Sequence, residues 1–212
     1  MKYAAYAMAT ALVFFLSVIG TGAADTIKLP KPQMTGGKPL MQCLSERHST
    51  RDLSDRKLSP QALSNLLWAA WGINRPDGKR TVPTANNKQG MDVYAALPEG
   101  VFLYDARANT LKPVVDKDLR ALTGRQDFVG KAPLNLIYVA DYSKMTNASD
   151  ADKLRYSAAH TGFMAENVYL YCASDGLGTV IRAWFDGPAL EKAMKLRSDQ
   201  KVILCQTVGY PK

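Results

Sequence analysis

The densest group of hydrogen-bond donors in this 212-residue chain is the segment Glu46-Arg47-His48-Ser49-Thr50-Arg51-Asp52. Arg47 and Arg51 carry planar guanidinium groups, which bind a phosphate through parallel hydrogen bonds, and Ser49 adds a short hydroxyl donor. This combination suits a phosphate monoester. Charged residues that follow a helix are also common in solvated turns, so the segment alone leaves both interpretations open.

A second polar segment, Pro83-Thr84-Ala85-Asn86-Asn87-Lys88-Gln89, lies within residues 74–90, which are rich in Asn, Gly, Pro and Lys. Asn and Gln side chains carry both donors and acceptors, which match the alternating edge of a pyrimidine-like ring. Long loops without regular structure are uncommon in compact domains and are often functional. Asparagine-rich loops also form ordinary turns, so a structural role is the alternative.

A third segment, Ser174-Asp175-Gly176-Leu177-Gly178-Thr179, has two glycines that allow backbone conformations closed to other residues. Such backbone can bring amide groups close to a ligand. A glycine that ends a helix is equally an ordinary C-cap.

Helices and strands are expected to position these three segments. Ser59 can cap, and Pro60 can begin, an amphipathic helix that ends at Gly72. Apolar runs predict the other elements, which are helices over 40–46, over 151–174 and from 186 onward, and strands over 93–97, 101–104, 134–140 and 201–207. Helices packed around a mixed β-sheet give a three-layer α+β fold in a single domain.

The helix over 151–174 is the longest predicted element. Its predicted buried face consists of Leu154, Ala158, Thr161, Ala165, Val168 and Cys172. Its small residues, including Ala159 and Gly162, would let a second helix approach closely, either in the core or in a subunit contact.

Residues 1–24 differ from the rest of the chain. Lys2 precedes an almost uncharged stretch that is most apolar over 11–19, and small residues lead to Asp25. This order predicts a secretory signal peptide that is cleaved near Ala24. A retained membrane anchor is the competing interpretation, since a bilayer span needs ~20 residues. We expect an exported protein, periplasmic or secreted, with an extended leader over 25–39 and one domain over 40–212.

The composition narrows the classes of ligand. The net charge is +8, but the basic residues are scattered, so nucleic acid is not an expected partner. Cys43, Cys172 and Cys205 allow at most one intrachain disulfide, and the sequence leaves their pairing open. No spacing of cysteines and histidines resembles a zinc site, so no metal is expected.

Taken together, these segments resemble the nitroreductase family of flavoproteins. Arg47-His48-Ser49-Thr50-Arg51 resembles the family's flavin-phosphate motif, and residues 83–89 are similar to its loop of proline, small residues, asparagine and glutamine. Residues 169–185 look like its long helix, glycine turn and following strand, and Val208-Gly209-Tyr210-Pro211-Lys212 resembles its Gly-Tyr-Pro end. The order and spacing agree over most of residues 40–212.

The resemblance implies noncovalently bound FMN and a homodimer with two flavin sites at the subunit interface. Arg47 and Ser49 would hold the phosphate, and Arg51 would lie near the pyrimidine end, where a cation stabilises reduced flavin. Asn87 would face the ring edge, and backbone at Leu177 and Gly178 would lie near N5. The full set of cofactor-binding residues implied is Arg47, His48, Ser49, Arg51, Pro83, Thr84, Asn87, Gln89, Leu177, Gly178 and Lys212, with Pro83 and Thr84 reaching the partner's flavin and His48 near the ribityl chain.

The chain departs from the family pattern at several positions. Lys88 replaces a more neutral residue, Gly90 and Met91 replace a Pro-Trp pair, and Glu166 stands where glutamine is frequent. The chain ends at Lys212, whereas many relatives continue to further basic residues. Residues 75–94 are most similar to the branch that includes the azoline dehydrogenases.

The function that the resemblance implies is an FMN-dependent oxidoreductase. By a ping-pong scheme, hydride or electrons would pass through flavin N5 to or from a small organic substrate that the sequence does not identify. No side chain need act as a catalytic residue, because the cofactor performs the chemistry. Export favours a periplasmic electron donor, or a dehydrogenase direction, over rapid NADPH turnover. The alternative is a redox-inactive ligand-binding or scaffold protein with the same fold.

Overall fold

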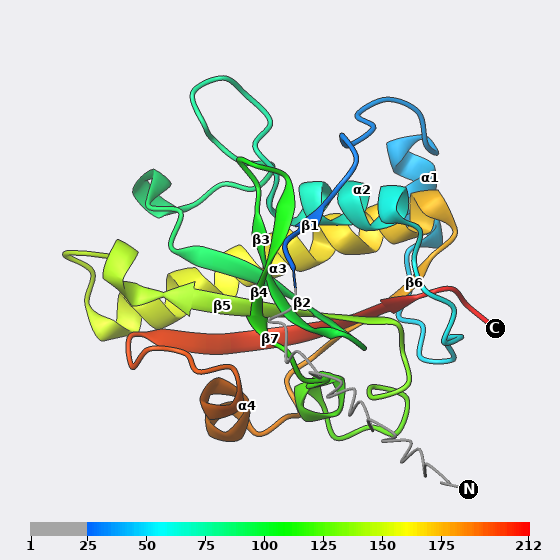
Figure 1. Ribbon diagram of the computed structural model, residues 1–212. Coiled ribbons are helices and arrows are strands. Elements are labelled where there is room, and N and C mark those ends of the chain that lie inside the picture. The colour runs from blue at the N-terminus through cyan, green and yellow to red at the C-terminus, as the bar shows by residue number, and fades with distance from the viewer. Residues whose placement is uncertain (1–24) are drawn as a thin grey trace, which may run out of the picture.

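The computed structural model describes residues 25–212, which form a seven-stranded sheet with helices on both faces (Figure 1). The predicted signal peptide lies outside the described residues. The strands are β1 (Ile27–Lys28), β2 (Met91–Leu97), β3 (Gly100–Asp105), β4 (Thr110–Val115), β5 (Leu134–Asp141), β6 (Gly178–Arg182) and β7 (Gln200–Gly209). The α-helices are α1 (Leu40–Glu46), α2 (Pro60–Trp71), α3 (Asp150–Asp175) and α4 (Gly187–Ala193), and the short 3₁₀ segments are η1 (Ala85–Asn87), η2 (Arg120–Thr123) and η3 (Tyr142–Lys144).

The predicted α+β class is confirmed, but the sheet is antiparallel rather than mixed. Its strand order is β1-β4-β3-β2-β5-β7-β6, and every neighbouring pair runs antiparallel. β5 and β6 point the same way and are joined through α3, as in a parallel crossover. They are not neighbours, however, because β7 returns along the sheet and lies between them.

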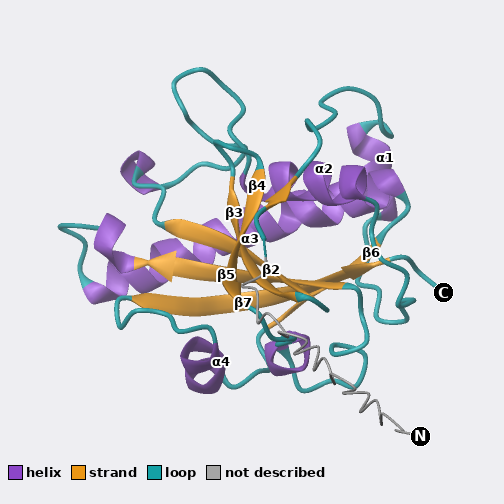
Figure 2. Ribbon diagram, viewed as in Figure 1, coloured by secondary structure: helices purple, strands orange, loops and turns teal. Residues whose placement is uncertain are grey.

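One face of the sheet is covered by α2 and α3 (Figure 2). The predicted start and end of α2 are confirmed: the Ser59 hydroxyl accepts from the Ala62 N–H at 3.1 Å, Pro60 is the first helical residue, and Gly72 ends the helix. The predicted apolar stripe of α2 is buried against the sheet and against α3, and it consists of Leu63, Leu66, Leu67, Ala70 and Trp71. This layer holds the larger apolar core.

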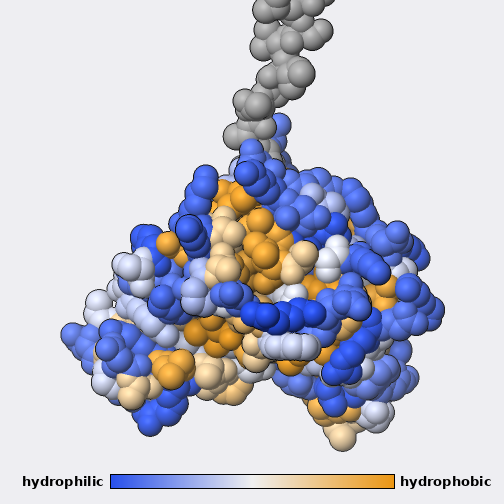
Figure 3. Space-filling view, turned by 90° about the horizontal axis from the view of Figure 1, so that it is seen from below, coloured by the Kyte–Doolittle hydropathy of each residue, from blue (hydrophilic) through white to orange (hydrophobic). Residues whose placement is uncertain are grey.

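The opposite face carries a second, smaller core. Leu190 and Met194, from α4 and the residue that follows it, pack against Ile137, Val139 and Cys205 of the sheet. Figure 3 views the molecule from the α4 side and shows apolar residues gathered in the middle of that face within a polar surround. Alternate residues of β5 therefore enter two different cores, which gives the expected three layers.

The predicted buried face of α3 is correct in its C-terminal half and wrong in its N-terminal half. Thr161, Ala165, Val168 and Cys172 are buried, but Leu154 is 60% exposed and Ala158 is also exposed. Two polar residues, Ser157 and His160, are buried instead. In this half Ser157 contacts Met145 and His160 accepts from the Ala85 N–H, so its inward side faces two loops.

β1 and β4 were not expected from the sequence. β1 is only two residues long and pairs with Thr110 and Leu111, which leaves the rest of β4 at the edge of the sheet. Pro113 is tolerated there because a proline lacks the N–H that a further neighbouring strand would need. No helix among residues 25–212 is both long enough and apolar enough to cross a bilayer.

Candidate functional site

The arginine segment lies directly against the end of β6 and the C-terminus of the chain. The Thr50 N–H donates to the Thr179 carbonyl at 2.9 Å, and the Ser54 N–H donates to the Tyr210 carbonyl at 2.8 Å. Leu53 also forms an isolated antiparallel β-bridge with Pro211. Three parts of the chain that are far apart in sequence therefore meet at one place, as the resemblance requires.

Gly178 makes this close approach possible. A Cβ at Gly178 would lie 2.7 Å from Leu53 Cδ2 and 2.8 Å from Thr50 Cγ2, which is closer than real Cβ atoms come to other carbons. The neighbouring Leu177 N–H is already engaged, since it donates to the Cys172 carbonyl at 2.9 Å. In this chain the glycine turn ends α3 and lets the arginine segment pack closely against the start of β6.

Arg47 and Ser49 meet on one residue of α3. The Arg47 guanidinium carbon lies 5.1 Å from the centroid of the Tyr169 ring, and Ser49 Oγ lies 2.8 Å from the Tyr169 hydroxyl. Glu166 Oε1 is 3.9 Å from Arg47 Nε, the outer limit of an ion pair. Ser49 is exposed and Arg47 is partly exposed, so both can reach a ligand.

The remaining cations of this region surround an open hollow. The hollow has a volume of about 620 Å³, within the ~300–1,000 Å³ of ligand pockets. Its lining holds three cations, Arg51, Lys131 and Lys212, and three carboxylates, Asp52, Asp55 and Asp127. Lys212 lies 3.2 Å from Asp52 Oδ1, and its N–H donates to the Asp52 carbonyl. The last residue of the chain is thus held beside the arginine segment.

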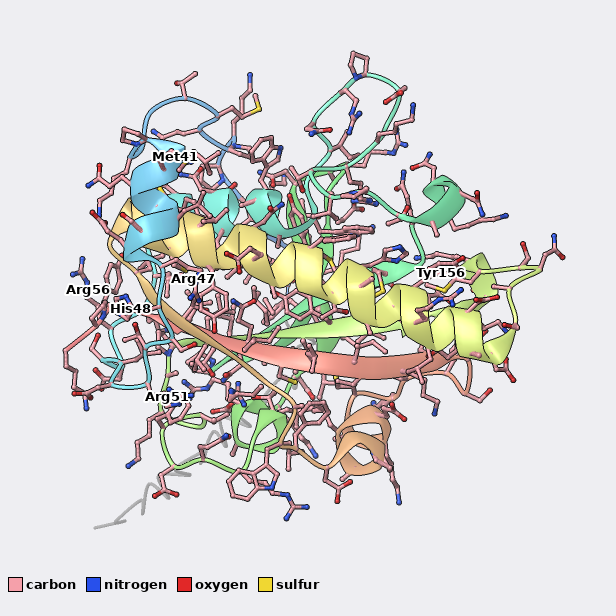
Figure 4. The ribbon with its side chains drawn as sticks, turned by 180° about the vertical axis from the view of Figure 1, so that it is seen from behind. Met41, Arg47, His48, Arg51, Arg56 and Tyr156 are labelled. Carbon is pink, nitrogen blue, oxygen red and sulfur yellow. The ribbon has the colours of Figure 1, made fainter. Side chains whose placement is uncertain are left out.

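His48 is exposed, and its Nδ1 lies 2.7 Å from the Glu46 carbonyl oxygen. Figure 4 shows Arg47 and His48 below α1, beside the C-terminal part of α3, and Arg51 farther from the helix, beyond the ends of β6 and β7. The whole predicted arginine cluster therefore occupies one end of the molecule.

Arg182 adds a buried positive charge behind the hollow. It is 5% exposed and donates to the Thr123 carbonyl at 2.5 Å, to Asn135 Oδ1 at 2.8 Å and to Thr207 Oγ1 at 2.6 Å. Burial lowers the pKa of Arg182, but a guanidinium remains charged at neutral pH. All three acceptors are neutral, and the guanidinium lies 6.0 Å from the ring of Phe128, which lines the hollow. Its charge adds to that of the three lining cations, which are matched in number by the three lining carboxylates.

The loop of residues 83–89 lies at the other end of α3. Its Ala85 N–H donates to His160 Nε2 at 3.0 Å, and a cavity of about 410 Å³ separates η1 from residues 145–148 and Tyr156. At ~1.5 Å per residue, His160 and Tyr169 are ~14 Å apart along α3. Within one chain, Pro83, Thr84 and Asn87 are therefore not brought together with the arginine cluster.

Gln89 is occupied within its own loop. Its carbonyl oxygen accepts from Arg80 Nε at 2.8 Å, and its amide nitrogen donates to the Gly78 carbonyl and to Asn87 Oδ1, each at 3.2 Å. The Arg80 guanidinium also stacks on Trp71 at 4.4 Å. Arg80 and Gln89 together shape this long loop and orient Asn87.

The three cysteines are buried and none of them forms a disulfide. Burial raises the pKa of Cys172 far above its ordinary value and that of Cys205 to about 12. Both thiols therefore remain protonated at neutral pH, as expected of buried cysteines that pack as small apolar residues.

Two residues of the site were missed from the sequence. Tyr169 looks like an ordinary core aromatic on a helix, and Arg182 looks like a surface cation in a strand. Only the alternation of strand β6, which places Arg182 on the same face as the buried Val180, could have indicated burial.

A model of the nitroreductase family matches residues 44–210. The chain belongs to the nitroreductase family. This family consists typically of flavin-dependent oxidoreductases. A protein named putative nitroreductase from Methanocaldococcus jannaschii is 30% identical over 178 residues, which cover 79% of this chain and 89% of the relative.

Solved structures agree with the membership in the nitroreductase family. The crystal structure of a putative nitroreductase from Ralstonia eutropha is 45% identical, with a TM-score of 0.86 and coverage of 92% of each chain. A chain of the Escherichia coli microcin synthetase complex has a TM-score of 0.68 at 20% identity, over 87% of this chain and 77% of that chain. The latter likeness concerns the fold alone, so the azoline-dehydrogenase branch stays a prediction.

Proposed function

We propose that this nitroreductase-family protein is an FMN-dependent oxidoreductase acting on a small organic substrate. The observation that carries the proposal is the meeting of the arginine segment with the β6 end and with the C-terminal residues, next to a hollow that Arg51 and Lys212 line. Family membership supports redox chemistry, and the local geometry supports the phosphate-bearing flavin.

The residues present fit FMN. Arg47, Ser49 and Lys212 offer charged and neutral donors to a phosphate, and exposed Arg51 offers a cation beside the hollow. The buried Arg182 adds positive charge without a carboxylate among its hydrogen-bond partners. The three cations and three carboxylates that line the hollow balance in number, so Arg182 supplies the net positive charge that a phosphate would offset.

When bound, FMN supplies the hydride-transfer chemistry, and the chain's own residues bind and orient it. Arg47 and Ser49 would hold the phosphate. Arg51 would provide fixed positive charge near the pyrimidine end, where it stabilises negative charge that develops on reduction. No protein nucleophile is needed, and the buried, protonated Cys172 and Cys205 are unsuited to that role.

We further propose a homodimer in which each site takes residues from both copies. Within one chain, the asparagine loop and the arginine cluster lie at opposite ends of α3, so a second copy is needed to bring Pro83, Thr84 and Asn87 to the same flavin. Exposed apolar residues beside this region, Met41 at 75% and Phe163 at 47%, are consistent with a covered surface. Sedimentation of the protein as a monomer with bound FMN would overturn this arrangement.

Export is also part of the proposal and rests on the composition of residues 1–24. Intact-mass analysis of protein purified from the producing cell should give a chain that starts near Asp25, recovered outside the cytoplasm. Donor use follows from this location, and we expect poor turnover with NADPH. A full-length chain in the cytoplasm would contradict export while leaving the flavin chemistry in place.

The flavin proposal is tested with Arg47→Ala. Loss of a charged hydrogen bond costs about 1.5–3 kcal/mol, so the dissociation constant of FMN should rise about 10- to 150-fold, with a parallel loss of redox activity. Arg107→Ala is the matched control, because Arg107 is an exposed arginine of the β3–β4 turn. A redox-inactive scaffold would instead show no flavin-dependent activity in the wild type and no change in either variant.

A further inference from the structure

Tyr169 of α3 connects the two predicted phosphate ligands to the sheet. Its side chain is 6% exposed, and its hydroxyl lies 2.8 Å from Ser49 Oγ and accepts from the Ile181 N–H at 3.1 Å. The face of its ring lies under the Arg47 guanidinium, 5.1 Å from the centroid. One buried side chain thus contacts both residues that are expected to hold the phosphate.

The hydrogen bonds of Tyr169 fix the direction of its proton. Because the oxygen already accepts from Ile181, its own proton needs an acceptor, and Ser49 Oγ is within reach. A buried O–H without an acceptor is costly, so the tyrosine donates to the serine. Ser49 Oγ then accepts the hydrogen bond of the Tyr169 hydroxyl. Because Ser49 is exposed, its own proton is free to point outward.

The same ring limits where the Arg47 guanidinium can lie. A guanidinium within ~6 Å of a ring centroid is attracted to the face of the ring, and this stacking leaves its N–H groups free at the edge. The other near group, Glu166, is 3.9 Å away and holds Arg47 only loosely. Tyr169 therefore supports Arg47 without consuming the donors that a phosphate would use.

We infer that Tyr169 is a positioning residue for a phosphate, one that orients the Ser49 hydroxyl as a donor. The inference rests on the proposed function, because it takes the phosphate of FMN as the ligand. Tyr169 itself does not touch the phosphate. It acts through Ser49, and the chain of donors runs from Ile181 N–H to Tyr169, from Tyr169 to Ser49, and from Ser49 to the ligand.

Tyr169→Phe tests the inference, because it removes the hydroxyl and retains the ring under Arg47. The dissociation constants of FMN and of riboflavin are measured by fluorescence titration of the full mature chain. We expect the constant for FMN to rise about 5- to 15-fold and the constant for riboflavin, which lacks the phosphate, to stay within about twofold. In Ser49→Ala, adding Tyr169→Phe should cause little further loss, because the two residues act in series.

Tyr171→Phe is the matched control. Tyr171 lies on the same helix, and its hydroxyl bonds to Asp175 and to the Ala62 carbonyl instead, so FMN affinity should not change. Equal weakening of FMN and riboflavin by Tyr169→Phe, or additive losses with Ser49→Ala, would show a merely structural role and overturn the inference. A wild-type chain that binds neither flavin would overturn the proposed function as well, whereas unchanged FMN affinity in Tyr169→Phe would overturn only this inference.

Discussion

Gly178→Ala should loosen the contact that joins the arginine segment to the sheet. The added Cβ would lie 2.7 Å from Leu53 Cδ2 and 2.9 Å from Thr50 Cβ. The leucine methyl can rotate away, but Thr50 Cβ is fixed to a backbone whose N–H is bonded to the Thr179 carbonyl. The segment itself must therefore move by several tenths of an ångström.

Overpacking of this kind costs about 1–3 kcal/mol, which corresponds to a fall in Tm of roughly 2–12 °C for a domain of this size. Thermal unfolding followed by circular dichroism measures the change, with and without FMN. Gly187→Ala is the control, because a Cβ there meets only Phe185 at an ordinary 3.9 Å. Because the displaced segment carries Arg47 and Ser49, FMN should also protect Gly178→Ala less than it protects the wild type. Equal Tm and equal protection in Gly178→Ala and wild type would refute this reasoning.

Two further predictions concern buried polar groups. Arg182→Leu leaves the Thr123 carbonyl without its donor and should lower the free energy of unfolding by about 1–3 kcal/mol, measured by urea denaturation. A variant as stable as the wild type would show that the buried charge was a net cost. Burial lowers the pKa of His160 below its ordinary value near 6.5, so the native state binds fewer protons than the unfolded chain. Stability should therefore fall as pH drops below ~6.5. The protection factor of the Ala85 amide, which compares its exchange rate with the intrinsic rate at the same pH, should fall as well, because imidazolium cannot accept its hydrogen bond. A protection factor at Ala85 that does not change between pH 7 and 5 would contradict this.

Local signals in the sequence predicted most of the fold. The clearest case is α2, which the sequence marks by the cap at Ser59, the proline at position 60 and an apolar stripe. The helix that these local signals predict is also the one whose apolar side packs in the core. β4 was missed because Pro113 is read as a strand breaker, and only the shortness of β1 leaves that position unpaired. The pairing of β4 with β3 is a local hairpin, whereas β1 pairs with residues more than 80 positions away and leaves no local pattern.

In the candidate site, too, the residues with a local sequence signal were predicted and those that depend on distant contacts were not. The donors Arg47 and Ser49 were found because phosphate chemistry needs those residue types close together in sequence. Tyr169 and Arg182 were missed because their roles arise from contacts with distant segments, and the sequence offers only ordinary helix and strand residues at these positions. Gly178 was identified, but its tightest contact is with the chain's own Thr50 and Leu53.

The most direct test of the account is the absorbance spectrum of the purified mature chain, with mass identification of what denaturation releases. We predict a yellow protein that releases FMN at about one molecule per chain. A colourless protein that cannot be loaded with added FMN would contradict the central claim that the arginine cluster and the β6 end form an FMN site.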